Sequence, residues 1–295
     1  MLSILIPVYN YNVVSLVEHL HRQAMELQIS FEILVHDDGS DATFNTINQN
    51  ISHLSDCQLI ETPFNRGRAE LRQQLANLAQ YDLLLFLDAD VMPRRVTFLQ
   101  NYLNNVTENQ DAVYGGFAYQ NTIPAPDASL RWRYGTAKEQ VDARIRNQKP
   151  YKIVISGNFL MKKSVFLTLN AQMTGFQYGY DNYFGALLKA GDFKVSHINN
   201  EVYHLGLDSN SDYLKKVEAS IETLLELYQT EAISKSDNTL LKTFKGLKKF
   251  KSHRFLAFVF RYRKTQLTAH LLSADPSINK LQFYKIGYMC ALDQN

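Results

Sequence analysis

The stretch YDLLLFLDADV, residues 81–91, decides the fold of this chain of 295 residues. Five apolar residues, 83–87, are followed at once by Asp88 and Asp90. A continuous apolar run of this length indicates a strand that is buried on both faces of a parallel sheet. Because uncompensated charge is costly to bury, we expect the two acids at the end of this strand to hold a divalent cation, and the cation to hold a diphosphate.

Two further apolar runs lie upstream, at residues 2–9 (LSILIPVY) and 31–40 (FEILVHDDGS). Segments with a helical period, residues 13–27 and 69–79, separate the three runs. In the first of these segments apolar side chains recur every three or four positions, at Val13, Val17, Leu20, Ala24 and Leu27. This order predicts βαβαβ units and therefore an α/β fold, with a mostly parallel central sheet flanked by helices.

Polar residues stand at the end of each predicted strand, in PVYN at 7–10, HDDGS at 36–40 and DADV at 88–91. Right-handed crossovers bring the carboxyl ends of parallel strands to one edge, where ligands bind in open α/β sheets. Each motif has a structural alternative, because DDGS also suits a strand-to-helix turn and DAD also suits a solvated loop. We expect a helix to begin at Pro93, which explains the turn but leaves the two acids unexplained.

Motifs that are weak singly follow one another in a familiar order along the chain. They are ILIPVYN at 4–10, VHDDGSDAT at 35–43, NRGRAELRQQL at 65–75, LFLDADV at 85–91, SGNFLMKK at 156–163, YGYDNYFGALLKAGDFKV at 178–195 and NNEVYHLG at 199–206. Together they resemble the family 2 glycosyltransferases, inverting enzymes of the GT-A fold. The resemblance implies a GT-A (Rossmann-like) nucleotide-sugar-binding domain in residues 1–206 and leaves residues 207–295 as a helical C-terminal extension.

The resemblance also implies a site for a nucleoside-diphosphate sugar donor. The residues assigned to it are Pro7, Tyr9, Asn10, Asp37, Asp38, Arg66, Arg68, Asp88, Ser156, Gly157 and Asn158. An aromatic face suits the base, carboxylates accept from base N–H or ribose hydroxyl groups, and guanidinium groups at a helix start suit phosphates. Solvated arginines at 66 and 68, and a tight turn at Gly157, remain the structural alternatives.

A metal site and a catalytic base complete the implied machinery. Mn²⁺ or Mg²⁺ prefers hard oxygen ligands, and Asp88 and Asp90, two positions apart in an extended segment, point to the same side. The resemblance adds His204 as a metal or diphosphate contact, although a lone histidine is also a common packing residue. The general base is assigned to Asp181, with Tyr180 at the position where the family commonly has glutamate; a helix N-cap is the alternative for this acid.

The C-terminal segments differ in character from the rest. Residues 210–229 carry an amphipathic stripe at Leu214, Val217, Ile221, Leu224 and Tyr228, which predicts a helix packed on the core. Residues 242–264 are rich in Lys and Arg with interleaved Phe, Leu and Val, and contain no acid. This composition suits either an interfacial helix at anionic lipid headgroups or a packed helix with a solvated basic face. Trp132, with arginines on both sides, suits either an acceptor contact or ordinary packing.

Composition and charge restrict the partners and the location. The net charge is only +2, so we expect no nucleic-acid partner. Cys57 and Cys290 lie in no metal-ligand or redox spacing, and we expect no disulfide. The N-terminal apolar run reaches Pro7 too soon for a signal peptide, which favours a cytoplasmic protein, either free or peripheral at the inner membrane face. The expected substrates are a nucleotide sugar and a glycan or lipid-linked acceptor.

Two other classes of function remain open from the sequence. A nucleotidyltransferase-like enzyme would share the sheet and the cation, but it usually has a Gly-rich, basic loop after the first strand, where this chain has PVYNYN. A non-catalytic nucleotide or nucleic-acid binder would use the basic tail and would not need Asp90.

Overall fold

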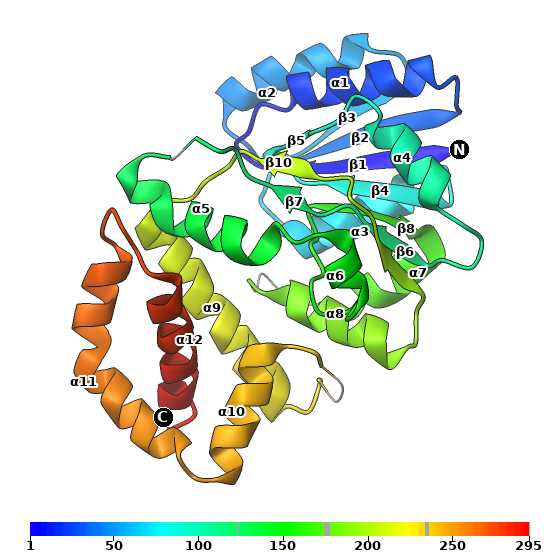
Figure 1. Ribbon diagram of the computed structural model, residues 1–295. Coiled ribbons are helices and arrows are strands. Elements are labelled where there is room, and N and C mark those ends of the chain that lie inside the picture. The colour runs from blue at the N-terminus through cyan, green and yellow to red at the C-terminus, as the bar shows by residue number, and fades with distance from the viewer. Residues whose placement is uncertain (123, 174–177, 234–235, 295) are drawn as a thin grey trace.

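A seven-stranded sheet forms the centre of the N-terminal part of the protein, as the computed structural model shows (Figure 1). The structure describes residues 1–122, 124–173, 178–233 and 236–294. The strand order is β3-β2-β1-β4-β8-β6-β9. The strands are β1 (Leu2–Val8), β2 (Phe31–Asp38), β3 (Cys57–Thr62), β4 (Leu83–Leu87), β6 (Ala112–Tyr114), β8 (Asn158–Lys162) and β9 (Val195–His197).

The sheet is mostly parallel, as the apolar runs predict. Strands β3, β2, β1 and β4 run in the same direction, and β6 and β9 pair in parallel, whereas β8 is antiparallel to both β4 and β6. Every residue of β1 and β2 is buried. Full burial of both faces explains why these strands are continuous apolar runs and not alternating ones.

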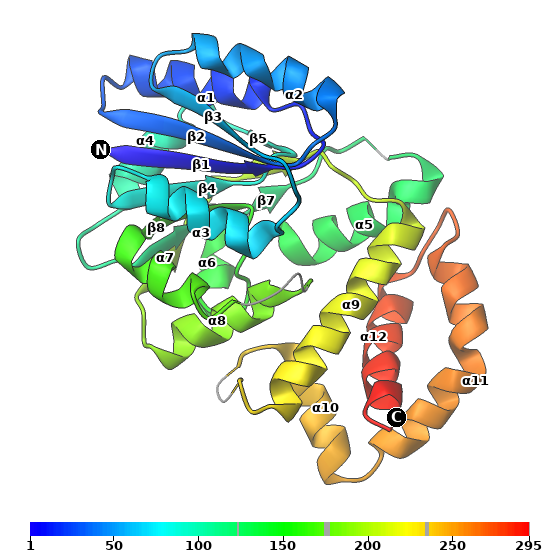
Figure 2. The ribbon, with the colours of Figure 1, turned by 180° about the vertical axis from the view of Figure 1, so that it is seen from behind.

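Helices cover both faces of the sheet, and β1 shows how its side chains are divided between them. Ile4 and Ile6 pack in one core cluster with α1 (Val14–Glu26) and α4 (Phe98–Asn105). Leu5 points the other way, into a second cluster with α3 (Arg68–Leu78), α7 (Lys163–Asn170) and α8 (Tyr180–Ala190). Figure 2 shows α1 and α3 on opposite sides of the strands. Short helical segments complete this part: α2 (Ala42–Asn48), η1 (Gln49–His53), η2 (Pro126–Ala128), α5 (Ser129–Tyr134), η3 (Gly135–Glu139) and α6 (Ala143–Asn147).

Two details differ from the sequence-based expectation. The edge strand β3 was missed, because its residues are only partly buried and its CQLIET sequence mixes polar with apolar residues. The helix expected at Pro93 does not begin there, because residues Val91–Pro93 form strand β5 and the helix α4 starts at Phe98. The proline is tolerated in β5 because this strand has only one neighbour, β10, and so lies at a sheet edge.

A second, three-stranded sheet carries the segment after Asp90. Its order is β5-β10-β7, with β10 (Val202–His204) antiparallel to β5 and parallel to β7 (Phe117–Ala118). The register places His204 opposite Val91. Asp90 and His204 are therefore neighbours, although they lie more than a hundred positions apart in the sequence.

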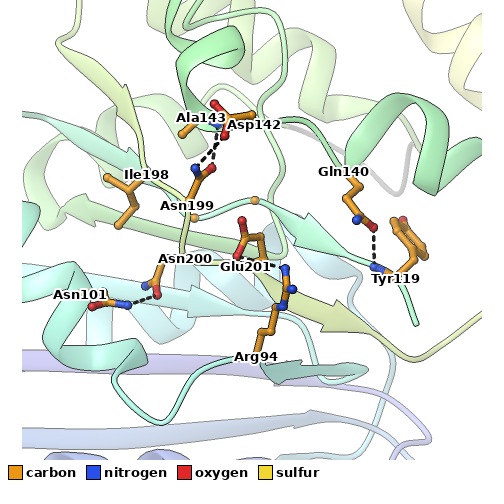
Figure 3. A network of polar contacts seen from close by, with 12 residues as sticks. Arg94, Asn101, Tyr119, Gln140, Asp142, Ala143, Ile198, Asn199, Asn200 and Glu201 are labelled. Atoms are coloured by element: carbon orange, nitrogen blue, oxygen red, sulfur yellow. Dashed lines mark hydrogen bonds and ion pairs between the residues drawn. The ribbon is translucent and has the colours of Figure 1, made fainter. Parts of the chain in front are cut away.

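Side-chain hydrogen bonds anchor the loop that leads into β10 (Figure 3). Asn200 accepts from Asn101 Nδ2 at 3.1 Å and donates to the Phe98 carbonyl at 2.9 Å. Asn199 accepts from the Ala143 amide at 2.8 Å and donates to Asp142 at 2.9 Å. These bonds tie the loop to α4 and to the start of α6. They therefore fix the position of β10 and of its last residue, His204.

The C-terminal residues form helices around a core of their own. They are α9 (Asn210–Gln229), α10 (Thr239–Lys249), α11 (His253–Leu271) and α12 (Ile278–Leu292). The predicted stripe of α9 is largely buried in this core, with Tyr228 partly buried, and Leu130 of α5 and Ala186 of α8 join the same cluster. In the described part of the chain, no helix is both long and apolar enough to cross a membrane.

We predict that Asn200→Ala lowers the free energy of unfolding by about 1–3 kcal/mol, because Asn200 is fully buried and its loss leaves the Phe98 carbonyl without this partner. Urea unfolding measures the change. Asn199→Ala is the matched control: this residue is exposed and its partner Asp142 can bond to water, so its effect should be smaller, below about 1 kcal/mol. Equal losses in both variants would contradict the account.

Candidate active site

The end of β2 contributes two acids that are used differently. Asp38 accepts from the amides of Arg66 and Gly67 at 2.8 and 3.0 Å, so its carboxylate holds the turn that precedes α3. Asp37 accepts from the Ser40 amide at 2.8 Å through Oδ1, while its Oδ2 is buried and has no hydrogen-bond partner in the described part of the chain. Of the two acids, Asp37 keeps an acceptor oxygen for a ligand.

The loop after β1 is tied to the loop after β2. Asn10 adopts a positive φ of 48°, a conformation that Asn tolerates better than most residues. Its amide donates to Ser40 Oγ at 2.7 Å and its Oδ1 accepts from the Asp41 amide at 2.8 Å. The neighbouring Tyr9 side chain is 54% exposed, whereas Pro7 is buried within β1. Tyr9 is thus free to offer a ring face at the carboxyl edge of the sheet.

Asp88 lies at the end of β4 between two arginines of α3. Arg68 Nη2 pairs with its Oδ2, and Arg72 Nη2 donates to its Oδ1 at 2.8 Å. Arg72 also donates to the Ser156 carbonyl at 2.5 Å. A Cβ at Gly157 would lie 2.5 Å from Asp88 Oδ2, so only glycine allows this loop to approach the carboxylate so closely.

The charges around Asp88 shift one another's pKa. Burial opposes ionisation of Asp88, but the two guanidinium groups outweigh it and lower the pKa of the carboxyl. Burial also opposes charge on Arg68, and Asp88 outweighs it and raises the pKa of Arg68. Burial and the nearby charge of Arg68 lower the pKa of Arg72 to about 10. All three groups remain ionised at neutral pH.

Arg72 is a site residue that the sequence analysis missed. Its side chain is only 9% exposed and lies at hydrogen-bond distance from both Asp88 and Ser156. The available signal was its spacing, because residues four apart in a helix lie on the same face, so Arg72 accompanies Arg68 toward the end of β4.

Asp90 and His204 form the second polar pair. His204 Nε2 lies 3.4 Å from Asp90 Oδ2, and the Leu205 amide donates to the Asp90 carbonyl at 2.8 Å. Gly206 is required beside them, because a Cβ there would collide with the Asp90 carboxylate. Burial raises the pKa of Asp90 and lowers the pKa of His204, so the surroundings disfavour charge on both groups. Within residues 1–122, 124–173, 178–233 and 236–294, His204 Nδ1 is buried without a hydrogen-bond partner.

Asp181 lies in the first turn of α8 and faces a cavity. The N-cap of this helix is Gly179, with φ 96°, so the alternative reading of Asp181 as an N-cap is wrong. Desolvation by the surrounding protein raises the pKa of Asp181, although Arg68 and Ser156 oppose the shift. A carboxyl that binds protons more strongly than usual is a better proton acceptor.

Two adjoining cavities contain some of these groups. The smaller, of about 280 Å³, is lined by Asp88, Ser156, Gly157, Asp181 and His204, with Arg68 beside them. The larger, of about 710 Å³, shares Arg68, Ser156 and Asp181 and extends to α9, α10 and α12. The structure therefore brings the predicted base, one predicted metal-site acid and the predicted histidine around one space.

Other predicted residues lie outside both cavities. They are Pro7, Tyr9, Asn10, Asp37, Asp38, Arg66, Asp90 and Asn158. Asn158 is fully buried, where it accepts from Tyr102 at 2.6 Å and donates to the carbonyls of Gly116 and Asn200 at 2.9 Å. With its side chain committed to these bonds, Asn158 offers little to a donor sugar, and this placement does not support its predicted contact. Arg66 is exposed and pairs with Glu70 at 3.1 Å.

Trp132 lines neither cavity. Its ring packs against the core of the sheet domain, and its Nε1 donates to the Gln120 carbonyl at 2.9 Å. This favours the packing alternative for the tryptophan. Its neighbour Arg131, by contrast, lines both cavities.

The comparisons with known proteins agree with this fold. The family model described as glycosyl transferase family 2 matches residues 3–169. No curated protein sequence matches the chain. A mannosyltransferase, PcManGT from Pyrobaculum calidifontis, solved in complex with GDP-Man and Mn²⁺, superimposes with a TM-score of 0.59 at 12% identity, over 100% of this chain and 86% of the other.

Two further solved structures share the fold. Glucosyl-3-phosphoglycerate synthase from Mycobacterium tuberculosis, in complex with Mn²⁺, UDP and glucosyl-3-phosphoglycerate, gives a TM-score of 0.51 at 15% identity, over 77% of this chain and 79% of the other. S. aureus TarS gives 0.51 at 15% identity, over 100% and 92%.

The fold and the site define a glycosyltransferase of the GT-A class. The chain belongs to glycosyl transferase family 2, because the family model matches more than half of its length. The resemblance noted in the sequence is thereby confirmed, as is the prediction of a GT-A fold with a helical C-terminal part. Membership of this family decides against a nucleotidyltransferase.

Proposed function

We propose that this glycosyltransferase moves a sugar from a nucleoside diphosphate to a hydroxyl group of an acceptor, with inversion at the anomeric carbon. The observation that carries the proposal is the small cavity in which Asp181 faces Asp88 and His204. The acceptor oxygen forms a bond to the anomeric carbon, the bond from that carbon to the diphosphate oxygen breaks, and the hydroxyl proton passes to Asp181.

The donor's nucleotide fits at the carboxyl edge of the sheet. Tyr9 provides an exposed ring for the base, and the unpartnered Asp37 Oδ2 can accept from a base or ribose group. Arg68 stands at the start of α3, where helix-terminal amides and a guanidinium group together favour a diphosphate.

The polar pair beside the cavity fits a divalent cation, Mn²⁺ or Mg²⁺. Asp90 supplies a hard carboxylate ligand, His204 lies 3.4 Å away with an imidazole kept neutral by burial, and Asp88 is ionised nearby. Among the residues that the structure describes, no three His, Cys, Asp or Glu side chains could hold a metal by themselves, so diphosphate oxygens and water would complete the shell. A bound cation neutralises charge on the departing nucleoside diphosphate. PcManGT and the M. tuberculosis synthase, which share the fold, were solved with Mn²⁺ and a nucleotide or nucleotide sugar.

The outer face of the extension supports a cytoplasmic enzyme that acts at the inner membrane face, on a glycan or lipid-linked acceptor. Phe255, Phe258 and Tyr262 of α11 are 71%, 68% and 77% exposed, and their spacing places them on one side of the helix. Between residues 238 and 274 the chain has nine Lys and Arg and no Asp or Glu. Among the ion pairs of the described residues, Lys242, Lys248 and Lys264 pair with acids outside this segment. Exposed aromatic rings among basic residues are typical of a surface that inserts into anionic lipid headgroups.

We predict that a screen of UDP-, GDP- and dTDP-sugars with Mn²⁺ will find at least one that raises the melting temperature of the protein and is slowly hydrolysed by it. The melting temperature rises because a ligand that binds only the folded state stabilises that state. Asp90→Ala should remove the Mn²⁺-dependent part of both effects. A panel that gives no stabilisation and no hydrolysis, or an Asp90→Ala protein equal to wild type, would contradict the proposed function and favour a non-catalytic binder.

We predict that Asp181→Asn keeps donor affinity but lowers transfer at least about a hundredfold, because only the proton acceptor is lost. In the wild type, transfer should fall as the pH drops through the pKa of Asp181, which lies above the ordinary aspartate value, since the protonated carboxyl cannot accept a proton. A pH profile of kcat/KM checks both points. A variant that retains the acid limb would show that another group titrates there.

We predict that replacing Phe255, Phe258 and Tyr262 together by Ser reduces binding to vesicles that contain phosphatidylserine by about tenfold or more, because each exposed ring loses apolar area that would be buried in lipid. Vesicle co-sedimentation at constant ionic strength measures the partitioning.

The matched control removes exposed apolar side chains from the sheet domain instead, at Met25, Leu78 and Val96, which are 52%, 54% and 78% exposed. This triple Ser variant should bind the same vesicles like wild type. Equal partitioning of all three proteins would refute the membrane contact.

A further inference from the structure

The larger cavity lies between the sheet domain and the helical extension, and its charged lining is mainly basic. The cationic residues are Arg68, Arg72, Arg131, Lys138, Lys152 and Lys285, and the acidic ones among the described residues are Glu139 and Asp181. Arg68 and Arg72 are already paired with Asp88. The remaining four cations come from three separate parts of the fold: α5 with η3, the loop before β8, and α12.

Arg131 is held rigidly and still has one donor to spare. The residue is 7% exposed, pairs with Glu139 at 2.9 Å, and lies between the rings of Tyr119 and Tyr213 at 5.4 and 5.3 Å. Its Nη1 is buried and has no hydrogen-bond partner among the residues that the structure describes. A buried guanidinium N–H without a partner is costly, so its presence in the wall of both cavities points to a ligand that accepts from it.

Lys285 approaches the same space from α12. Its Nζ lies 4.0 Å from the centre of the Tyr134 ring, and Tyr134 in turn contacts Tyr213 at 5.9 Å between ring centres. In the described parts of the chain, neither Lys285 nor Lys138 nor Lys152 forms an ion pair with a carboxylate. The Glu139 carboxylate is engaged by Arg131 and by the Tyr119 hydroxyl. The cavity therefore has more positive charge than its own acids balance.

The two cavities divide the site into a donor side and an opposite side. Asp88 and His204 line only the smaller cavity, Gln282 and Lys285 line only the larger one, and Asp181 lines both. In Figures 1 and 2, α5 lies between the sheet and the pair α9 and α12, which agrees with this order. Of the four remaining cations, Lys285 lines only the larger cavity, whereas Arg131, Lys138 and Lys152 line both. Lys285 is therefore the cation that distinguishes the larger cavity from the donor side with Asp88 and His204.

We propose that the larger cavity is the acceptor subsite and that it takes an acceptor carrying an anionic group, a phosphate or a carboxylate, which binds to Arg131, Lys138 and Lys285. This inference rests on the proposed function, because it places the acceptor hydroxyl at Asp181. The aromatic rings around Arg131 and Lys285 provide apolar faces for the rest of the acceptor. An anion there removes the cost of the unpartnered Arg131 N–H and balances the lysines.

The test begins with inorganic phosphate as a probe, titrated calorimetrically into the protein in the presence of Mg²⁺ and saturating UDP or GDP to occupy the diphosphate side. We expect phosphate to bind, and Lys285→Gln and Lys138→Gln each to weaken it by about tenfold, the loss expected for one charge-assisted contact. Lys280→Gln is the matched control, because Lys280 is exposed on the same helix and lines neither cavity. These variants spare Arg131, whose removal would strand Glu139 in the protein interior.

The second arm compares three compounds of similar size as inhibitors or acceptors of sugar transfer: glycerol 3-phosphate, glycerate and glycerol. We expect the two anions to act at least about tenfold more strongly than glycerol, and their order shows whether phosphate or carboxylate is preferred. We expect Lys285→Gln to abolish the difference between the anions and glycerol while the donor KM stays unchanged. Equal action of the three compounds, no phosphate binding, or equal losses in Lys280→Gln and Lys285→Gln would overturn the inference. Donor hydrolysis without acceptor tests the proposed function separately, so absent hydrolysis with intact, Lys285-dependent phosphate binding would reject the function and retain the anion site.

Discussion

The ion pairs of Asp88 with Arg68 and Arg72 are the constraint on which the rest of the site depends. β4 is buried, so a carboxylate at its end must be compensated, and two guanidinium groups on one face of α3 provide this. Arg72 also holds the Ser156 carbonyl, and Ser156 lines the same two cavities as Asp181. These contacts therefore fix the Ser156 loop, which lines the site beside the proposed base, relative to the end of β4.

Much of the fold follows from local sequence pattern. The apolar runs of β1, β2 and β4 are strands because parallel strands between two helical layers have no polar face, and the stripe of α1 is buried where its spacing predicts. The polar strand ends do gather at one edge. The pattern failed where an element has an exposed side, as at β3, whose residues are only partly buried, and where a residue took an unexpected role, as at Pro93 in an edge strand.

Site residues could be predicted where a short sequence motif contains them, but not where only tertiary contacts bring them to the site. Asp88 and Asp90 lie two positions apart in one motif, whereas His204 reaches Asp90 only through the pairing of β10 with β5, which the sequence could suggest by resemblance alone. Asn158 belongs to a motif, but it is buried and its side chain makes hydrogen bonds within the protein. Lys285 belongs to no motif, because its place beside the cavity depends on how α12 packs against α5 and α9.

The shared wall of the larger cavity couples two cores. α9 contributes Tyr213 and Ile221 both to the packing of the extension and to the cavity lining, and Leu130 of α5 is buried in the same cluster. A molecule that contacts both parts must bind them more tightly when they are packed together than when they are apart. By thermodynamic linkage it must stabilise their packing by the same free energy. Packing of the helical extension against the sheet domain therefore contributes to the free energy of ligand binding. Conversely, the strength of this packing depends on whether the cavity is occupied.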